Sequence, residues 1–279
     1  MPNSPDPKLP STAKSGPLDG TTGPGNTQPS PLSGQTVLIT RAAEQAESLR
    51  GPLQHLGACV VVHPVIRILP PTDGTLLNEA IGRIDEYDWV VFVSTNTVRF
   101  FLERLKEFRG SLDPLAKLKI AAIGVSTASF LKQHFDIESD LIPPQSNSRS
   151  LADSLIGAAG GQKLLIARAN RGSPDLANAL SQANVKFDVL ITYDSHDVES
   201  ATPSVIEQLK QGEIDWVTVT SGAIARSTVN LFGKFLHNTK LVSISPGTTS
   251  VLAELGFAVA AEAKDYNMTG IVEAIKQGG

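Results

Sequence analysis

Short runs of β-branched and other apolar residues alternate along this chain with segments whose apolar residues recur at helical spacing. Residues 36–40 form the first such run and predict a strand. The following segment, 42–56, predicts a helix, because its apolar residues return every three or four positions until Gly57 ends the pattern. The chain therefore opens with a strand, a helix and a glycine stop.

The same alternation continues to the C-terminus. Further strands or extended segments are predicted at 58–62, 65–69, 88–94, 119–123, 137–143, 163–167, 187–193, 215–221, 241–245 and 257–263. Further helices are predicted at 76–84, 97–108, 126–134, 150–158, 175–182, 203–211, 223–235, 248–255 and 269–276. Strands that alternate with helices in this way indicate parallel sheets covered on both faces, so we predict doubly wound α/β units.

The pattern also repeats itself within the chain. Residues 88–94 (DWVVFVS) and 215–221 (DWVTVTS) both run from an aspartate through one of the two tryptophans into an apolar strand that ends at a serine. The offset of 127 residues relates further pairs, namely Gln35 with Gln162, Leu38 with Leu165, and Arg41 with Arg168. We infer an internal duplication and predict two similar domains.

Composition and charge narrow the class of protein. A chain of 279 residues that is 41% hydrophobic can bury a sizeable core, and its net charge of −4 without a long basic run argues against nucleic-acid binding. A single cysteine, Cys59, excludes an intramolecular disulfide, and the scattered histidines predict no metal site. Without an apolar run of about 20 residues we expect no membrane span, and a reducing cytoplasm is the expected location.

Residues 1–33 differ from the rest of the chain. They hold eight of the 18 prolines and no valine, isoleucine or aromatic residue. Such a segment buries too little apolar surface to offset the entropy of ordering it, so we predict a disordered tail. It lacks the apolar core of a signal peptide and the arginines of a transit peptide.

Candidate binding residues lie in loops where predicted strands end and helices begin. Ligands of open parallel sheets bind at this edge, where helix N-termini attract anions. The loop residues with hydroxyls or free backbone N–H groups are Ser94, Thr95, Thr127, Ser221, Gly222 and Thr248. Each hydroxyl could instead serve only as a helix N-cap, but the duplication of these loops favours one shared ligand cleft.

Three larger side chains stand at strand ends. Arg41 and Arg168 end the duplicated first strands and could hold an acidic ligand or make local salt bridges. Tyr193 ends the strand 187–193 and could be functional or simply half-packed. No G-x-G-x-x-G turn, P-loop or G-x-S-x-G elbow is present, which disfavours a dehydrogenase or methyltransferase, a P-loop enzyme and a serine hydrolase.

Taken together, these segments make the chain resemble the uroporphyrinogen-III synthase family. The resemblance is carried by VLITR at 37–41, FVSTNTVRFF at 92–101, AAIGVSTASFL at 121–131, VLITYDS at 189–195, VTSGAIA at 219–225, SISPGTTSVLAELG at 243–256 and MTGIV at 268–272. The order and spacing of these segments are specific together, and the resemblance covers 36–277. One departure is Ser245, where many members of the family have glycine.

The resemblance implies two α/β domains joined by a two-stranded hinge, with the active-site cleft between them. One domain would comprise 34–64 plus 197–279 and the other 67–193. The hinge crossings would lie at 65–66 and 194–196. Each half of the sequence would lend its first strand, helix and strand to the other half's domain.

The resemblance further implies a cyclising hydro-lyase of porphyrin and heme biosynthesis. The enzyme would close hydroxymethylbilane, a linear polycarboxylate tetrapyrrole, to uroporphyrinogen III with inversion of ring D through a spiro intermediate, releasing water. It would need no metal and no organic cofactor. Tyr193 would be catalytic by assisting departure of the hydroxyl group. The loop hydroxyls, led by Thr127, Thr248, Ser94 and Ser221, would bind substrate acids.

The remaining alternative is a non-catalytic two-lobed protein that binds a small anion, since duplicated α/β lobes around a cleft also serve that purpose. For the enzyme we expect a cytoplasmic monomer that binds neither nucleic acid nor membrane.

Overall fold

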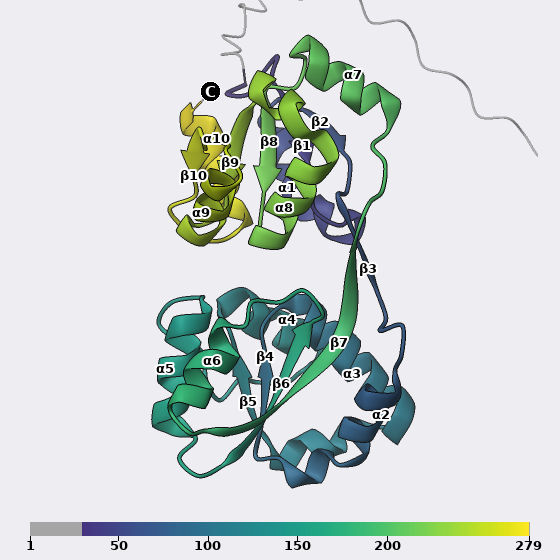
Figure 1. Ribbon diagram of the computed structural model, residues 1–279, viewed down its shortest axis with the longest axis vertical. Helices are drawn as coiled ribbons and strands as arrows, with labels where there is room; N and C mark the ends of the chain where they lie inside the picture. The colour runs from purple at the N-terminus through teal and green to yellow at the C-terminus, as the bar shows by residue number, and fades with distance from the viewer. Residues whose placement is uncertain (1–29, 279) are drawn as a thin grey trace, which may run out of the picture.

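The computed structural model describes residues 30–278, and within that range strands and helices alternate as the apolar pattern predicts. Figure 1 shows two α/β lobes, one above the other, connected by two strands. No helix within residues 30–278 combines the length and the apolar character that a membrane crossing requires.

The upper lobe in Figure 1, called lobe 1, is built on a parallel sheet with the order β10-β9-β8-β1-β2. Its strands are β1 (Thr36–Ile39), β2 (Cys59–Val62), β8 (Trp216–Val219), β9 (Lys240–Ser243) and β10 (Ala261–Glu262). Its helices are α1 (Ala43–His55), α7 (Pro203–Gln211), α8 (Gly222–Phe232), η3 (Gly233–Asn238), α9 (Pro246–Glu254) and α10 (Met268–Gly278).

The lower lobe, lobe 2, has the sheet order β3-β7-β6-β4-β5. Its strands are β3 (Ile66–Leu69), β4 (Trp89–Phe92), β5 (Lys119–Ala122), β6 (Lys163–Ala169) and β7 (Lys186–Asp197). Its helices are α2 (Thr75–Gly82), η1 (Ile84–Glu86), α3 (Thr95–Arg109), η2 (Asp113–Lys117), α4 (Val125–Phe135), α5 (Ser148–Ala158) and α6 (Asp175–Gln182). Strands β4 to β7 are parallel, and β3 runs antiparallel to β7.

Both faces of each sheet are covered, because successive strand residues point to opposite sides. In lobe 1, Leu38 and Val217 pack with α7, α8 and α9, whereas Val37 and Trp216 pack with α1 and α10. In lobe 2, one face packs with α2, α3 and α4 and the other with α5 and α6. The prediction of doubly wound parallel sheets is therefore confirmed.

Strand β7 carries the chain from lobe 2 toward lobe 1. Its first residues pair in parallel with β6, and its last four, 194–197, pair antiparallel with β3, from Leu69 opposite Asp194 to Ile66 opposite Asp197. The predicted strand ended at Tyr193. The structure extends it because β3 provides backbone partners for residues whose polar side chains do not by themselves predict a strand.

The two duplicated aspartates tie each sequence half to the other. The Asp88 carboxylate accepts a 2.7 Å hydrogen bond from the backbone N–H of Lys163, at the start of β6. The Asp215 carboxylate accepts one of 2.7 Å from the backbone N–H of Thr36, at the start of β1. Each aspartate therefore holds the first strand of the opposite half.

The duplicated tryptophans also link the two halves of the sequence by hydrogen bonds. Trp89 donates from Nε1 to Gln162 Oε1 at 2.8 Å, and Trp216 donates to Gln35 Oε1 at 2.9 Å. As a result the unit β1-α1-β2 lies in the sheet of β8 and β9, and β6-α6-β7 lies in the sheet of β4 and β5. The sequence repeat thus corresponds to a reciprocal exchange of strand-helix-strand units.

Two details of the sequence prediction need correction. Residues 30–33, assigned to the disordered tail, are part of the folded structure, because Leu32 is fully buried and its N–H donates to Leu56 O at 2.9 Å. Residues 1–29 lie outside the described range. The strand expected at 257–263 is reduced to β10, since Phe257 packs into the core instead of pairing.

Candidate active site

The carboxyl ends of the strands of both lobes border one large cleft. It has a volume of about 1490 Å³ and is lined by residues of both lobes. From lobe 1 come the loops after β1, β8 and β9, and from lobe 2 the loops after β4 and β5. This is the edge at which open parallel sheets bind ligands.

Ser94 and Ser221 both line this cleft and both cap helices. Ser94 Oγ accepts from Thr97 N at 3.2 Å at the start of α3, and Ser221 Oγ accepts from Ile224 N at 3.2 Å at the start of α8. The two interpretations of these serines are therefore compatible, because a hydroxyl that accepts from the backbone can still donate its proton to a ligand. Thr95 and Gly222, the first residues of α3 and α8, also line the cleft.

Thr127 and Thr248 occupy the first turns of α4 and α9. Both line the cleft, although each residue is only 3% exposed. The backbone of Ser245, before α9, is extended with φ −165°, a conformation open to any residue, so serine fits where the family often has glycine. Its duplicate Gly124 is also extended, but there a Cβ would overlap the Ser146 side chain.

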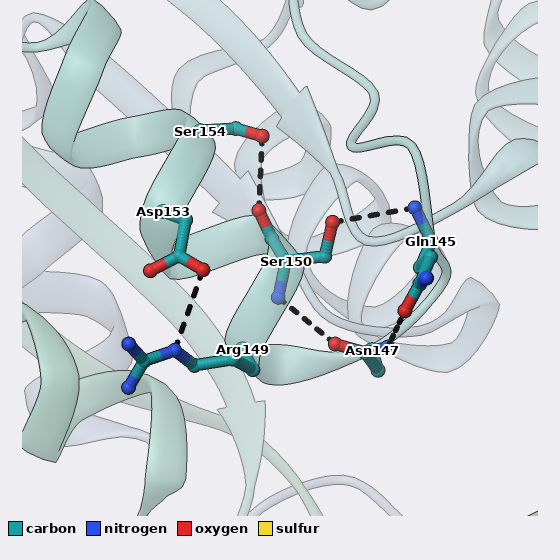
Figure 2. A network of polar contacts seen from close by, with 6 residues as sticks. All are labelled: Gln145, Asn147, Arg149, Ser150, Asp153 and Ser154. Atoms are coloured by element: carbon teal, nitrogen blue, oxygen red, sulfur yellow. Dashed lines mark hydrogen bonds and ion pairs between the residues drawn. The ribbon is translucent and has the colours of Figure 1, made fainter.

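Two further segments of the cleft were missed by sequence reasoning, 145–149 at the start of α5 and 266–268 at the start of α10. Figure 2 shows the first, in which Asn147 Oδ1 accepts from Ser150 N at 2.9 Å. In the second, Asn267 Oδ1 accepts from Gly270 N at 2.9 Å. The offset of 120 between these two asparagine caps was a sequence signal that could have revealed them.

Arg149, in the first turn of α5, also lines the cleft. Its Nε lies 3.3 Å from Asp153 Oδ2 in an exposed pair one helical turn apart (Figure 2). Such exposed pairs contribute about 0–1 kcal/mol. The guanidinium can therefore exchange this partner for a ligand at little cost.

Arg41 lines the cleft from the end of β1. Its guanidinium donates to Gln45 Oε1 at 3.1 Å, to Ser48 Oγ at 3.0 Å and toward the Met268 sulfur at 2.7 Å. Burial lowers the pKa of Arg41 to about 10, so the group remains charged at neutral pH. All three acceptors are uncharged, so Arg41 has no anionic partner among them and remains suited to an anionic ligand.

Gln45 connects the two lobes beside Arg41. While its Oε1 accepts from Arg41, its Nε2 donates to Asn96 Oδ1 at 2.9 Å. Gln45 belongs to α1 of lobe 1 and Asn96 to α3 of lobe 2. The orientation of the Gln45 amide is therefore set by two contacts: its oxygen accepts from Arg41, and its nitrogen donates to Asn96 of lobe 2.

Tyr193 and Arg168 do not line the large cleft. They line a smaller cavity of about 190 Å³ in lobe 2, between the sheet and α6. We call this cavity the side chamber. Its lining includes residues that also line the cleft: Val93, Ser94, Ile123 and Ser148.

The two side chains are held differently in the chamber. Tyr193 is 9% exposed, and its ring stacks on Phe100 with centroids 5.5 Å apart. Within residues 30–278 its hydroxyl has no hydrogen-bond partner. Arg168 Nε donates to Ala169 O at 3.3 Å and Nη2 donates to Gly172 O, which leaves Nη1 uncommitted. A Cβ at Gly172 would lie 3.0 Å from Arg168 Nε, so a larger residue there would require the guanidinium to shift by a few tenths of an ångström.

The cleft and chamber gather cations despite the net negative charge of the chain. In the described part of the protein, Arg41, Arg99 and Arg168 line these two cavities and form no ion pair. Across residues 30–278, no three His, Cys, Asp or Glu side chains are grouped so that they could hold a metal ion. The site is arranged to bind anionic groups through guanidinium groups, hydroxyls and helix N-termini.

Comparison with known proteins agrees with this arrangement. The family model described as "Uroporphyrinogen-III synthase HemD" matches residues 47–273. The uroporphyrinogen-III synthase of Synechococcus elongatus is 29% identical over 88% of this chain and 96% of its own length. The porphyrin biosynthesis protein HemD of Ruminiclostridium josui is 31% identical over 87% of this chain and 46% of its own length.

Solved structures support the fold. A mutant uroporphyrinogen III synthase from Thermus thermophilus superposes with a TM-score of 0.61, covering 88% of this chain and 98% of its own at 17% identity. The enzyme from Helicobacter pylori gives a TM-score of 0.60, covering 87% and 99% at 18% identity. Sequence, fold and site thus favour the enzyme over a non-catalytic anion-binding protein, and the chain belongs to the uroporphyrinogen-III synthase family, a family of cyclising lyases in heme biosynthesis.

Proposed function

We propose that the cleft binds hydroxymethylbilane and closes it to uroporphyrinogen III with inversion of ring D. The observation that carries this proposal is the convergence, in one cleft, of duplicated helix N-termini and guanidinium groups without carboxylate partners. A flexible polycarboxylate needs many such anchors to be held in one folded conformation. The alternative closure to the type I isomer is then excluded by positioning.

Loss of water starts the reaction. The C–O bond of the terminal hydroxymethyl group breaks with both electrons going to oxygen, which takes a proton from the Tyr193 hydroxyl, while the pyrrole nitrogen donates electron density to the exocyclic carbon. The pyrrole N–H proton returns to the tyrosine, so one water leaves and an azafulvene remains. The substituted carbon of the last pyrrole attacks this electrophile and forms a spiro intermediate. The bond from that carbon to its original bridge carbon then breaks, which leaves the neighbouring ring as a second azafulvene. The unsubstituted α-carbon of the last ring bonds to this bridge carbon, and its proton returns to the first pyrrole nitrogen. These steps need no metal or organic cofactor.

The remaining site residues bind substrate acids in this proposal. Arg41 and Arg168 offer charge-assisted hydrogen bonds. The hydroxyls and backbone N–H groups at the four duplicated helix starts offer further donors, and these residues are Ser94, Thr95, Thr127, Ser221, Gly222 and Thr248. The proposal is supported by the position of all six along the cleft.

We propose the domain organisation that the family resemblance implies. One domain comprises 34–64 plus 197–279 and the other 67–193, with the hinge at 65–66 and 194–196. This proposal is supported by which strands form each of the two sheets, and by the antiparallel pairing of β3 with the end of β7. We propose further that the enzyme acts as a cytoplasmic monomer, since both lobes of the cleft come from one chain.

The function is tested by supplying the purified protein with freshly prepared hydroxymethylbilane, without cofactors. After oxidation, the porphyrin isomers are separated chromatographically. We expect mainly the type III isomer. A product mixture that contains only the type I isomer, which also forms spontaneously, would show that the protein is not this enzyme.

Replacing Arg41 with methionine should raise KM for hydroxymethylbilane. Methionine fills similar space, but the charge-assisted bond to a substrate carboxylate is lost, at about 1.5–3 kcal/mol, which corresponds to about 10–100-fold in KM. Steady-state kinetics of the isomer assay measure the change.

The control for this variant is Arg50→Met on α1, the helix that follows Arg41. Arg50 lies 3.7 Å from Glu47 in an exposed ion pair and is not among the residues that line the cleft. Its KM should equal that of the wild type. Equal KM values for Arg41→Met and Arg50→Met would remove Arg41 from the binding site.

A further inference from the structure

The Tyr193 hydroxyl is placed only by the ring that carries it, since no group in the described part of the chain bonds to it. The phenolic oxygen lies on the axis of the ring, so rotation about χ2 leaves it in place, and χ1 or the backbone must change to move it. The O–H bond of a phenol lies in the plane of its ring, so χ2 sets the direction in which the proton points. The placement of this proton therefore depends on what holds the Tyr193 ring.

Phe100 of α3 holds this ring from one side. The two ring centroids lie 5.5 Å apart and the ring planes are inclined by 24°, a stacked geometry within the about 4.5–7 Å usual for aromatic pairs. The face of Phe100 blocks a swing of the tyrosine about χ1 toward α3. The near-parallel planes restrict rotation about χ2. Phe100 thus limits both angles on which the position of the proton depends.

The backbone of β7 is irregular beside Tyr193. Arg168 of β6 lies opposite Ile191. The next residue, Ala169, lies opposite Tyr193, so one residue of β7 is skipped. A shift of this kind bends a strand and re-aims the side chains beside it. Directly after Tyr193, β7 leaves β6 and pairs with β3, so the regular ladder does not by itself set the direction of this side chain.

The surroundings of Phe100 favour a role in positioning over a role in packing or binding. It is only partly buried and does not belong to the core cluster that includes its neighbour Phe101. It is not among the residues that line the cleft or the side chamber. The Arg99 guanidinium carbon lies 4.6 Å from its ring centroid, within the about 6 Å of a cation–π contact. Phe100 therefore stacks on Tyr193 while it is itself held by a second contact.

We propose that Phe100 is a positioning residue for the reaction. It holds the Tyr193 ring in the orientation from which the hydroxyl gives up its proton. This inference rests on the proposed function, in which Tyr193 is the proton donor. Because Phe100 lines neither cavity, its loss should change turnover and not substrate binding.

The first test replaces the flat ring. Phe100→Leu should lower kcat for hydroxymethylbilane by about 10–100-fold, because a misplacement of about 1 Å can cost about 10²-fold in rate. KM should stay at the wild-type value. Phe100→Tyr keeps a flat ring and should recover most of the lost rate. Steady-state kinetics of the isomer assay give both constants, and Phe100→Met tests the same loss of a flat ring if the leucine variant does not fold.

The matched control is Phe108→Leu. Phe108 belongs to the same helix, is 47% exposed and lines neither cavity. The substitution is the same as in Phe100→Leu, but the ring lost has no contact with Tyr193. Its kcat and KM should equal those of the wild type.

A double-mutant cycle separates positioning from a general loss of structure. In Tyr193→Phe there is no hydroxyl left to place, so adding Phe100→Leu should not lower kcat further. A defect in folding or in the cleft would lower kcat by the same factor in both backgrounds. The cycle therefore responds to the link between the two rings.

The inference fails if Phe100→Leu keeps the wild-type kcat, if Phe100→Tyr is as slow as Phe100→Leu, or if Phe100→Leu lowers kcat equally in both backgrounds. It also fails if Tyr193→Phe itself turns over at the wild-type rate. In each of these cases a wild type that forms the type III isomer leaves the proposed function intact. A wild type that forms only the type I isomer refutes the function itself, so the two failures are distinguishable.

Discussion

Tyr193→Phe should lower kcat by about 10²–10⁴-fold, the range typical for loss of a proton donor in the transition state. The ring would keep its stacking on Phe100, because phenylalanine has the same shape and the centroids lie 5.5 Å apart in the native protein. Only the hydroxyl is removed, and it has no partner of its own in the described structure. Substrate binding through the arginines and helix N-termini would persist, so KM should change little.

The matched control is Tyr87→Phe. The Tyr87 hydroxyl donates to Asp188 at 2.7 Å, away from both cavities, and Asp188 retains Lys163 Nζ at 3.0 Å when that hydroxyl is removed. Its kcat should match the wild type. If Tyr193→Phe also turns over at the wild-type rate, departure of the hydroxyl group does not depend on this tyrosine.

Trp216→Ala should destabilise lobe 1 by about 3–5 kcal/mol, the cost of removing a large buried side chain. Trp216 is fully buried, and its indole N–H donates to Gln35 at 2.9 Å. The loss is a large part of the about 5–15 kcal/mol that usually holds a domain folded. Chemical denaturation measures the loss, and amide hydrogen exchange locates it, with faster exchange expected in β1, β8 and β9.

Two variants accompany this experiment. Trp216→Phe keeps an aromatic ring and loses the hydrogen bond to Gln35, so it should cost less and remain measurable if the alanine variant does not fold. Trp89→Ala removes the duplicate residue, 2% exposed in lobe 2, and should speed exchange in β4, β5 and β6 instead. If either variant by itself sped amide exchange equally in both sheets, the two lobes would not have independent hydrophobic cores.

Much of the fold followed from short-range patterns. The β-branched runs and the helical spacing predicted the alternation of strands and helices, and α6 and α7 were predicted with the bounds that the structure shows. Errors arose where a strand is defined by its partner. Residues 194–197 are polar and form a strand only against β3, and the segment after Phe257 keeps only β10 because that phenylalanine turns into the core.

The position of several loop residues along one cleft could be predicted from the duplication. Ser94, Ser221, Thr127 and Thr248 line one cleft, as their place after duplicated strands suggested. The division between cleft and side chamber was not predictable, because it depends on how α6 packs over β6 and β7. The hydrogen bonds from the Arg168 guanidinium to Ala169 O and Gly172 O were likewise not predictable, because they depend on the backbone path of residues 169–172.

The exchange of strand-helix-strand units has a consequence for how such a protein can arise. A half-chain by itself holds β1 and β2 but not β8 and β9, so neither of its partial sheets is complete. Two copies of one half-chain, each lending its first unit to the other, would complete both sheets and enclose a symmetric cleft. This single chain has the form of a domain-swapped dimer whose subunits have become covalently joined. Joining them lets the two sides of the cleft diverge, so that lobe 2 can carry Tyr193 in its side chamber independently of the sequence of lobe 1.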